Sequence, residues 1–222
     1  MTVLLLVRHG HTPTAGKVLT GWQRGVHLTE HGREQAEALA RRLQETTVAA
    51  IYSSPLERCR ETAAPLARAR GIPVRVHRGL IETGYGDWTG RSIPQLRRTR
   101  LWRTLQQSPS AIRFPGGETL RDVQARALDA VEAISDEHPH GTVVVVTHAD
   151  VVRMLLAHAA GVHLDLFERF AVEPGSISAI ALHDGRVRVL KVNDTGELTS
   201  LAPPRRPRRR TSRPAATRKV EG

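Results

Sequence analysis

The sequence predicts an α/β fold: a three-layer α/β/α sandwich with a mostly parallel central sheet and an antiparallel edge strand. Two apolar runs rich in Val and Leu, residues 2–7 and 142–147, indicate strands that are buried on both faces of a sheet. Strands alternate with helical periodicity along most of the chain, which is typical of a parallel sheet covered by helices. Near the C-terminal end, an Asp-Gly pair between the strand-like runs 177–182 and 187–192 indicates a hairpin, and therefore antiparallel pairing at the edge.

The other elements are predicted from periodicity and from helix-start signals. Thr29 has the position of an N-cap, and Thr119 with Asp122 resembles a capping box. The predicted helices cover about residues 30–43, 56–70, 93–107, 120–137 and 151–160, and two further strands cover residues 49–52 and 74–76. Residues 11–28 and 79–90 lack periodicity, and long loops of this kind often carry function.

Composition indicates one globular domain followed by a basic tail. The chain has 222 residues, of which 40% are hydrophobic and 25% charged, an ordinary balance for a domain with a core. We expect this domain to cover residues 1–202. Residues 203–222 hold eight basic side chains and one glutamate, so +7 of the formal net charge of +11 lies there. This Pro- and Arg-rich segment is poor in apolar residues, and we expect it to be disordered.

Cysteine content and apolar run lengths predict the location and the partners. A lone Cys59 builds no disulfide framework, which favours a cytoplasmic location. The N-terminal apolar run is too short for a secretory signal, and no stretch approaches the length of a membrane span. We therefore expect a small-molecule partner and no membrane. A nucleic acid is expected at most through the basic tail, and a homodimer stays open.

Both predicted central strands end on a histidine, His9 directly after Arg8 and His148 after the second strand. Parallel strands end at the same edge of a sheet, where ligands bind in α/β folds. Arg58 lies early in a predicted helix that follows another strand, and helix N-termini favour anions. Guanidinium groups match phosphate oxygens, and a neutral imidazole can be a nucleophile. This set favours phosphoryl transfer, with Glu82 on a glycine-rich loop as the candidate proton carrier.

Five segments together resemble a known family. They are Arg8-His9-Gly10, the Ser-Pro-Leu-x-Arg segment that ends at Arg58, the loop from Glu82 to Gly90, Gly116-Gly117-Glu118, and Val146-Thr147-His148. In this order they resemble the histidine phosphatase superfamily, in its phosphoglycerate-mutase-like branch, over about residues 3–183. Further segments resemble a subgroup described only as probable phosphomutases.

The resemblance implies a role for each residue of the predicted site. His9 would be the nucleophile and form a phosphohistidine, and Glu82 would protonate the leaving oxygen. Arg8, Arg58 and His148 would hold the phosphoryl group during its transfer. Since Glu82 must be protonated when it acts, burial or negative neighbours should raise its pKa.

Two more residues and the absence of a cofactor follow from the same resemblance. Thr20 and Gly21 match a family segment that borders the substrate. Neither a cofactor nor a metal is implied, because arginine and histidine charge replaces Mg²⁺. The expected activity is that of a metal-independent phosphomonoesterase acting on a small phosphorylated metabolite.

Departures from the mutase pattern favour hydrolysis over a phosphomutase, which remains the alternative. Ala15, or Thr14 if the loop is shorter, stands where the mutases have an asparagine, and Ala149 replaces a glycine. The long basic insertion of the classical mutases is also absent, and only four arginines lie in residues 97–103. Retaining a bisphosphate for return transfer would need additional cations.

Two remote alternatives come from other classes of protein. Residues 10–18 resemble a Walker loop, but five residues separate the glycines and Val18 replaces the hydroxyl residue that binds Mg²⁺. A P-loop nucleotidase is therefore a near miss. The second alternative is a polyanion-binding protein that acts through the arginines of the tail, with strong salt dependence.

Overall fold

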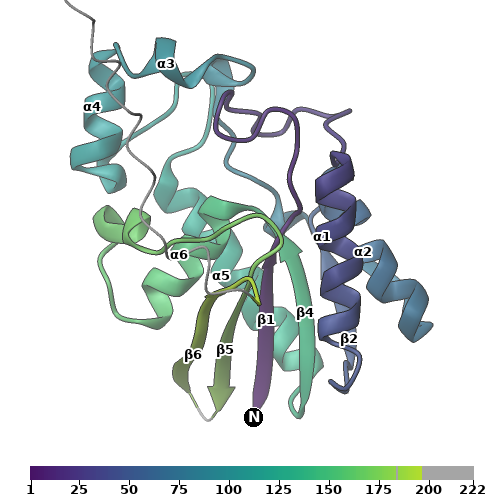
Figure 1. Ribbon diagram of the computed structural model, residues 1–222. Coiled ribbons are helices and arrows are strands. Elements are labelled where there is room, and N and C mark those ends of the chain that lie inside the picture. Colours follow the sequence, from purple (N-terminus) through teal and green to yellow (C-terminus); the bar gives the residue numbers. More distant parts are fainter. Residues whose placement is uncertain (184, 197–222) are drawn as a thin grey trace, which may run out of the picture.

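The fold is built on a six-stranded sheet with the strand order β3-β2-β4-β1-β5-β6 (Figure 1). The computed structural model describes residues 1–183 and 185–196, so the basic segment 203–222 lies outside the described residues. The strands are β1 Thr2–Arg8, β2 Ala50–Ser53, β3 Val74–Val76, β4 Gly141–Thr147, β5 Ile177–His183 and β6 Arg186–Asp194. Strands β1 to β4 are parallel, whereas β5 runs antiparallel to β1 and β6 antiparallel to β5. The predicted mixed sheet is confirmed.

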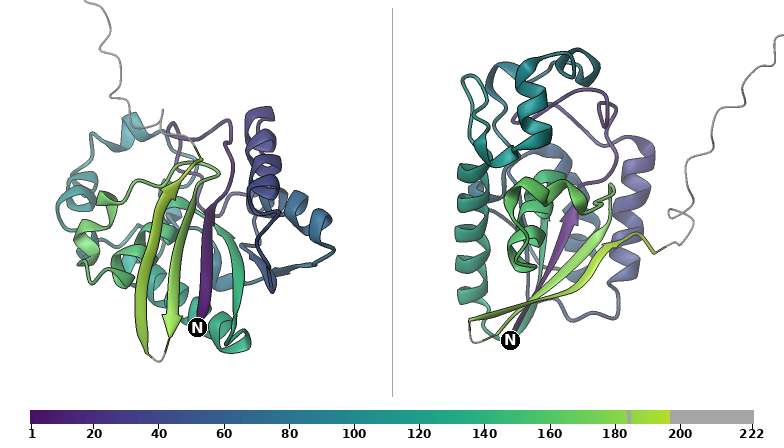
Figure 2. Two further views of the ribbon diagram at one scale, coloured as in Figure 1. Left: turned by 60° about the horizontal axis from the view of Figure 1, so that its bottom comes forward. Right: turned by 90° about the vertical axis from the view of Figure 1, so that its left-hand side faces the viewer.

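Helices cover both faces of this sheet, as predicted. The main helices are α1 Glu30–Arg42, α2 Glu57–Arg70, α3 Ile93–Leu96, α4 Arg100–Gln107, α5 Leu120–Glu137 and α6 Ala149–Ala159, and four short 3-10 turns, η1 Arg78–Leu80, η2 Gly86–Trp88, η3 Pro109–Ala111 and η4 Leu164–Arg169, link them. Seen along the sheet, α5 lies on one side and α1 on the other (Figure 2, right). Each layer between the helices and the sheet has its own apolar core. Leu39 of α1 and Leu66 of α2 belong to one core, and Val123 of α5 and Leu155 of α6 belong to the other.

The register of the two central strands places both histidines at one edge of the sheet. Arg8 of β1 pairs with Thr147 of β4, so the residue after each strand is a histidine at the same level. The backbone N–H of His9 continues the ladder by donating to the carbonyl oxygen of Thr147 at 2.9 Å. The apolar runs, fully buried in β4 from Val143 onward, make this part of the sheet rigid.

Helix α1 begins tightly against the loop that follows His9. Thr29 caps it by accepting a hydrogen bond from the N–H of Gly32 at 3.1 Å, as the sequence predicted. A Cβ atom on Gly32 would lie 2.2 Å from the carbonyl oxygen of His11, and one on Gly10 would lie 2.5 Å from that of Gly32. Only glycines allow this approach, which fixes the loop next to His9.

The predicted single helix over residues 93–107 is wrong. The chain forms α3 and α4 instead, separated at Thr99. The Thr99 hydroxyl donates to the carbonyl oxygen of Leu96 at 2.7 Å and accepts from the N–H of Trp102 at 3.2 Å. Thr99 is the N-cap of α4, so its hydroxyl takes the place of a backbone carbonyl as the acceptor for the Trp102 N–H. A residue in this position starts the second helix and thereby ends the first.

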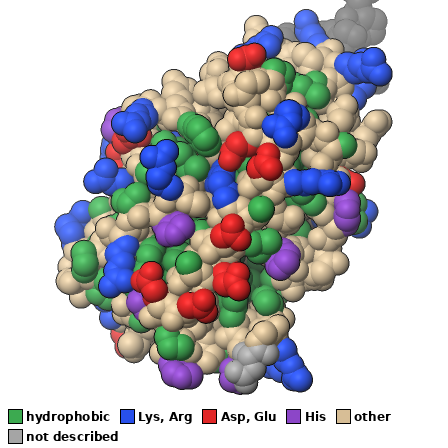
Figure 3. All heavy atoms as spheres, turned by 180° about the vertical axis from the view of Figure 1, so that it is seen from behind, with side chains coloured by type: hydrophobic (Ala, Val, Ile, Leu, Met, Phe, Trp, Pro, Cys, Tyr) green, Lys and Arg blue, Asp and Glu red, His purple; other side chains and the backbone are tan. Residues whose placement is uncertain are grey.

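Most of the excess positive charge of the sequence lies in residues 203–222, so a strongly basic face of the domain is not expected. On the face seen from behind, acidic and basic side chains are interspersed and form no continuous basic surface (Figure 3). Within the described residues, none of the helices has the length and apolar character that crossing a bilayer requires.

Candidate active site

A cavity of about 470 Å³ lies at the edge of the sheet where the parallel strands end. Of the residues predicted for the site, Arg8, His9, Thr20 and Glu82 line it. Arg58 and His148 are 1% and 0% exposed and are not among the lining residues, although His148 lies next to His9. The ring centroids of His9 and His148 are 5.3 Å apart, with an interplanar angle of 68°. The structure therefore brings together side chains from the ends of β1 and β4, from α2 and from two loops.

His9 is held as a neutral imidazole with one nitrogen free for chemistry. Its Nδ1 lies 2.8 Å from the carbonyl oxygen of Gly10. A carbonyl only accepts, so Nδ1 carries the proton and Nε2 carries the lone pair. Burial, together with the positive charge of Arg58, lowers the pKa of His9 to about 3. The imidazole is therefore unprotonated at neutral pH, as a nucleophile must be.

His148 is fixed by a serine and faces the carboxyl group of Glu82. Its Nε2 lies 2.8 Å from the hydroxyl oxygen of Ser54, and its Nδ1 lies 3.7 Å from Oε2 of Glu82. Burial and the charge of Arg58 lower the pKa of His148 well below its usual value. When the Ser54 hydroxyl donates to Nε2, the proton of neutral His148 sits on Nδ1, on the side of Glu82. A donor there can bind a phosphoryl oxygen.

The two arginines keep part of each guanidinium group unbound. Arg58 donates to the carbonyl oxygens of Gly21 at 2.8 Å and Gln23 at 3.4 Å, and Arg8 donates to that of Val172 at 2.6 Å. In both arginines Nε is buried without a partner in the described structure. Buried donors that lack an acceptor are costly, and a phosphate group supplies acceptors in the fork geometry that arginine matches.

Thr20 and Gly21 contribute in different ways. Thr20 lines the cavity, as expected for a residue that borders a substrate. Gly21 does not line it; its carbonyl oxygen instead accepts the hydrogen bond from Arg58 at 2.8 Å. The contact of Gly21 with substrate stays a prediction, and what the structure shows is a contact that orients the arginine.

Glu82 has the electrostatic environment of a proton donor. The residue is 9% exposed, and Oε1 accepts a hydrogen bond from the N–H of Thr83 at 2.9 Å. Burial, with the negative charge of Asp150, raises its pKa to about 7 against the opposing charge of Arg58. A carboxyl group of this pKa is protonated in a large fraction of molecules at neutral pH, as the sequence reasoning required.

The sequence analysis missed the clamp that holds the Glu82 loop. Arg126, on α5, donates to the carbonyl oxygen of Glu82 at 2.9 Å, to two other carbonyls of the loop, and to both carboxylate oxygens of Glu118. Glu118 in turn accepts from the N–H of Gly84 at 2.7 Å, and the Trp22 indole also donates to the Glu82 carbonyl at 2.6 Å. In the sequence, only the motif Gly116-Gly117-Glu118 pointed to this clamp, and the motif by itself did not indicate what Glu118 contacts.

We expect Arg126→Ala to lower kcat by roughly 10- to 100-fold, because a carboxyl displaced by about 1 Å donates its proton poorly. The loss should be larger for alkyl phosphates than for p-nitrophenyl phosphate, whose leaving group needs no proton. Steady-state kinetics on both esters measures it, with the exposed Arg121→Ala on the same helix as the control. An equal loss on both esters would show that the clamp does not act through Glu82.

A second missed group is an anchored carboxylate next to Glu82. Asp150, in the first turn of α6, accepts from the Tyr85 hydroxyl at 2.8 Å and from Arg153 at 3.1 Å. It lines the cavity and is the largest charge that raises the pKa of Glu82. Its position two residues after His148 was the available signal.

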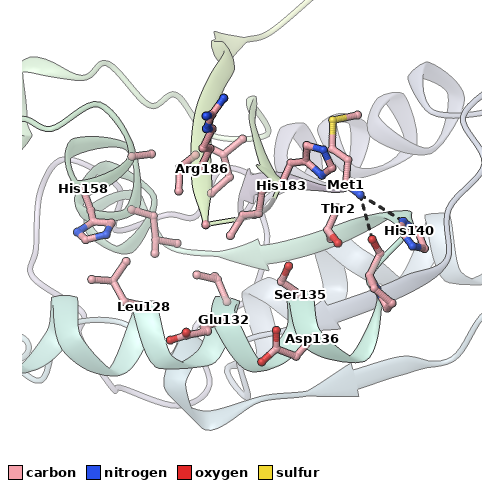
Figure 4. Close-up of a pocket in the computed structure, with 18 residues that line it drawn as sticks. Met1, Thr2, Leu128, Glu132, Ser135, Asp136, His140, His158, His183 and Arg186 are labelled. Atoms are coloured by element: carbon pink, nitrogen blue, oxygen red, sulfur yellow. Dashed lines mark hydrogen bonds between the residues drawn. The ribbon is translucent and has the colours of Figure 1, made fainter.

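A larger cavity, of about 570 Å³, lies near the other end of the sheet between α5, α6 and the β5–β6 hairpin. Its labelled lining residues include Glu132 and Asp136 on α5, His158 on α6, and Arg186 beside the hairpin turn (Figure 4). The lining lacks a set of buried cations such as the one around His9, so it does not suit a phosphate. Among the described residues, no three His, Cys, Asp or Glu side chains are grouped to hold a metal ion.

An α/β sheet that delivers a neutral imidazole, two arginines and a protonated carboxyl group to one cavity defines a phosphoryl-transfer enzyme. Comparison with known proteins agrees. The chain belongs to the histidine phosphatase superfamily (branch 1), whose family model matches residues 4–195. The expected family is confirmed.

Several relatives are phosphatases by name. The chain is 32% identical over 203 residues to phosphoserine phosphatase 1 of Hydrogenobacter thermophilus, which covers 89% of this chain and 95% of that protein. It is 35% identical over 164 residues to glucosyl-3-phosphoglycerate phosphatase of Mycobacterium tuberculosis, and the match covers 69% of this chain and 73% of that protein. The structure of Bacillus stearothermophilus YhfR superposes with a TM-score of 0.82 at 34% identity, and the match covers 87% of this chain and 98% of that chain.

Proposed function

We propose that this protein is a phosphomonoesterase that hydrolyses a small phosphorylated metabolite through a phosphohistidine at His9. The observation that carries the proposal is the pairing of His9 Nδ1 with the Gly10 carbonyl, which leaves Nε2 as a nucleophile beside two arginines whose buried Nε atoms have no partner. The relatives named as phosphatases support hydrolysis of small phosphate esters.

The mechanism uses two displacements at phosphorus. In the first, the Nε2 lone pair of His9 forms the N–P bond while the bond between phosphorus and the ester oxygen breaks, and Glu82 gives its proton to that oxygen. Arg8, Arg58 and His148 donate to the three phosphoryl oxygens and offset their charge. In the second, Glu82 takes a proton from water, the water oxygen bonds to phosphorus, and the N–P bond breaks to release phosphate.

Hydrolysis is favoured over a phosphomutase by the charges around the cavity. Of the four arginines in residues 97–103, Arg97 lines the cavity, whereas Arg98, Arg100 and Arg103 are exposed and do not. Arg153 also lines the cavity, but it is paired with Asp150 at 3.1 Å, so a bisphosphate held for return transfer would need more free cations than these residues offer. The P-loop alternative is disfavoured because the next helix after Lys17 begins only at Glu30, whereas a Walker loop leads directly into one.

A phosphate-release assay on a panel of phosphorylated metabolites, with and without EDTA, tests the proposed function. We expect phosphate release from several esters at unchanged rate in EDTA, and little conversion of 3- to 2-phosphoglycerate. Efficient isomerisation without phosphate release would instead identify a mutase, and loss of activity in EDTA would contradict a metal-independent reaction.

We propose a catalytic domain at residues 1–202 and a separate basic tail at residues 203–222, which lies outside the described residues. Cys59 is a buried free thiol, and this supports the proposed cytoplasmic location. A truncation after Ala202 that keeps full activity would support the division; loss of activity would contradict it.

The raised pKa of Glu82 predicts how activity depends on pH. Turnover of alkyl phosphates should fall as the pH rises through about 7, because the acid then loses its proton. Asp150→Asn removes the negative charge that raises this pKa, so the falling limb should move to lower pH. Profiles of kcat for both proteins measure the shift, with the exposed Asp129→Asn as control. A limb that stays in place would contradict the electrostatic role of Asp150.

A further inference from the structure

The cavity is larger than the ester of a three-carbon acid requires. Its volume of about 470 Å³ lies in the range of pockets that enclose ligands of drug size. Arg8, His9 and Glu82 form the part next to the sheet, and α4 and η4 supply further wall. In Figure 1, α4 stands above and to one side of the end of the sheet. There is room for a ring-sized group on the ester oxygen.

The wall that α4 and η4 form combines an apolar base with a polar rim. Trp102, Leu105 and Gln106 lie one turn apart on the same side of α4, and all three line the cavity together with Phe167 and Glu168 of η4. Leu105 and Phe167 are buried, Trp102 is half-buried, and Gln106 and Glu168 are exposed.

The groups of this wall are held in place before any ligand binds. The Trp102 ring stacks on Trp88, with ring centroids 6.1 Å apart and an interplanar angle of 20°. Trp88 itself is 3% exposed and packs in the core. At the rim, the amide Nε2 of Gln106 donates to the carboxylate of Glu168 at 3.3 Å. The Trp102 side chain and an amide–carboxylate pair therefore border the same cavity.

The combination of an aromatic ring with an amide–carboxylate pair suits a sugar ring. A sugar has a C–H face that packs on an aromatic ring, and hydroxyl groups on its edge that both donate and accept. A carboxylate accepts two hydrogen bonds and an amide supplies both a donor and an acceptor, which matches neighbouring hydroxyls. A three-carbon acid has no ring to pack on Trp102 and fewer hydroxyl groups to pair with the rim.

We propose that Trp102, Gln106 and Glu168 form a sugar subsite, so that the preferred substrates are phosphomonoesters of ring sugars. This inference rests on the phosphatase activity proposed above. Contacts with the sugar, made away from the reacting atoms, would align the ester with His9 and thereby raise kcat/KM.

The test compares kcat/KM for hexose and pentose phosphates with kcat/KM for glycerol 3-phosphate, a polyol ester without a ring. Phosphoserine, 3-phosphoglycerate and AMP complete the panel. We expect at least one sugar phosphate to exceed glycerol 3-phosphate by tenfold or more. A three-carbon ester that equals or exceeds every sugar phosphate would overturn the proposal, and so would AMP as the best substrate.

Variants of α4 test whether the preference for sugar phosphates comes from the wall that α4 and η4 form. Trp102→Ala and Gln106→Ala should each reduce the ratio of kcat/KM for the best sugar phosphate to that for glycerol 3-phosphate by at least fivefold. Trp102→Phe should retain most of this ratio. Gln107→Ala is the matched control, because Gln107 is exposed on the same turn and does not line the cavity. Equal effects of Gln106→Ala and Gln107→Ala would contradict a subsite here.

The outcome also separates this inference from the proposed function. Hydrolysis of p-nitrophenyl phosphate that depends on His9, without any preference for sugars, would leave the phosphatase in place and remove the subsite. Absence of hydrolysis of every ester would remove both.

Discussion

His9→Ala will lose at least about 10⁴-fold in kcat on every phosphate ester while the protein remains folded. The substitution removes the nucleophile, and no other group in the cavity can replace it, because the second imidazole is turned to Ser54 and Glu82. The residual rate would come from the arginines, which can still bind and polarise the phosphate. Initial rates of phosphate release, with thermal melting to check the fold, measure the loss.

His11→Ala is the matched control for this variant. His11 lies two residues further along the same loop, and its Nδ1 contacts the Thr29 hydroxyl at 3.1 Å; it does not line the cavity. We expect its kcat to stay within a few-fold of the parent. If both alanine variants lost activity equally, damage to the loop would explain the result better than the loss of a nucleophile.

Glu82→Gln will separate esters by the basicity of their leaving groups. Without the proton of Glu82, an alkoxide must leave unprotonated, so kcat for alkyl phosphates should fall by about 10²–10⁴-fold. p-Nitrophenolate is stable as an anion, and its departure should slow by less than tenfold. Glutamine keeps the shape of the side chain, which accepts a hydrogen bond from Thr83 and lies 3.7 Å from His148.

The measurement is a plot of log kcat against leaving-group pKa for the two proteins. The Glu82→Gln line should be steeper than the line for the parent enzyme. Parallel lines would assign the proton transfer to another group. Loss of the falling limb near pH 7 in the variant would be a second sign that Glu82 is the group that titrates.

Local sequence patterns were enough to predict which residues lie together at the ends of the central strands. The doubly apolar runs of β1 and β4 fixed the sheet edge at which His9 and His148 meet, since parallel neighbours end together. The capping box at Thr119 was also visible, because its partner lies three residues away. The family resemblance then assigned roles to residues whose proximity the strands had already implied.

Contacts between distant segments were beyond such patterns. Arg126 reaches the Glu82 loop from a helix 44 residues further along the chain, and nothing in the helical periodicity of α5 marks it. Trp22 contacts the same loop from a position 60 residues earlier in the chain. The break at Thr99 escaped because helical spacing continues through it, whereas the decisive event is a side-chain hydrogen bond.

Trapping the phosphorylated enzyme tests the central claim most directly. Glu82→Gln, mixed rapidly with ³²P-labelled p-nitrophenyl phosphate and quenched in base, should accumulate label because the second step lacks its base. Peptide mapping should find the phosphoryl group on Nε2 of His9, acid-labile, and absent when His9→Ala is added. Label on any other side chain, or label that survives in the His9→Ala background, would contradict a phosphohistidine at this position.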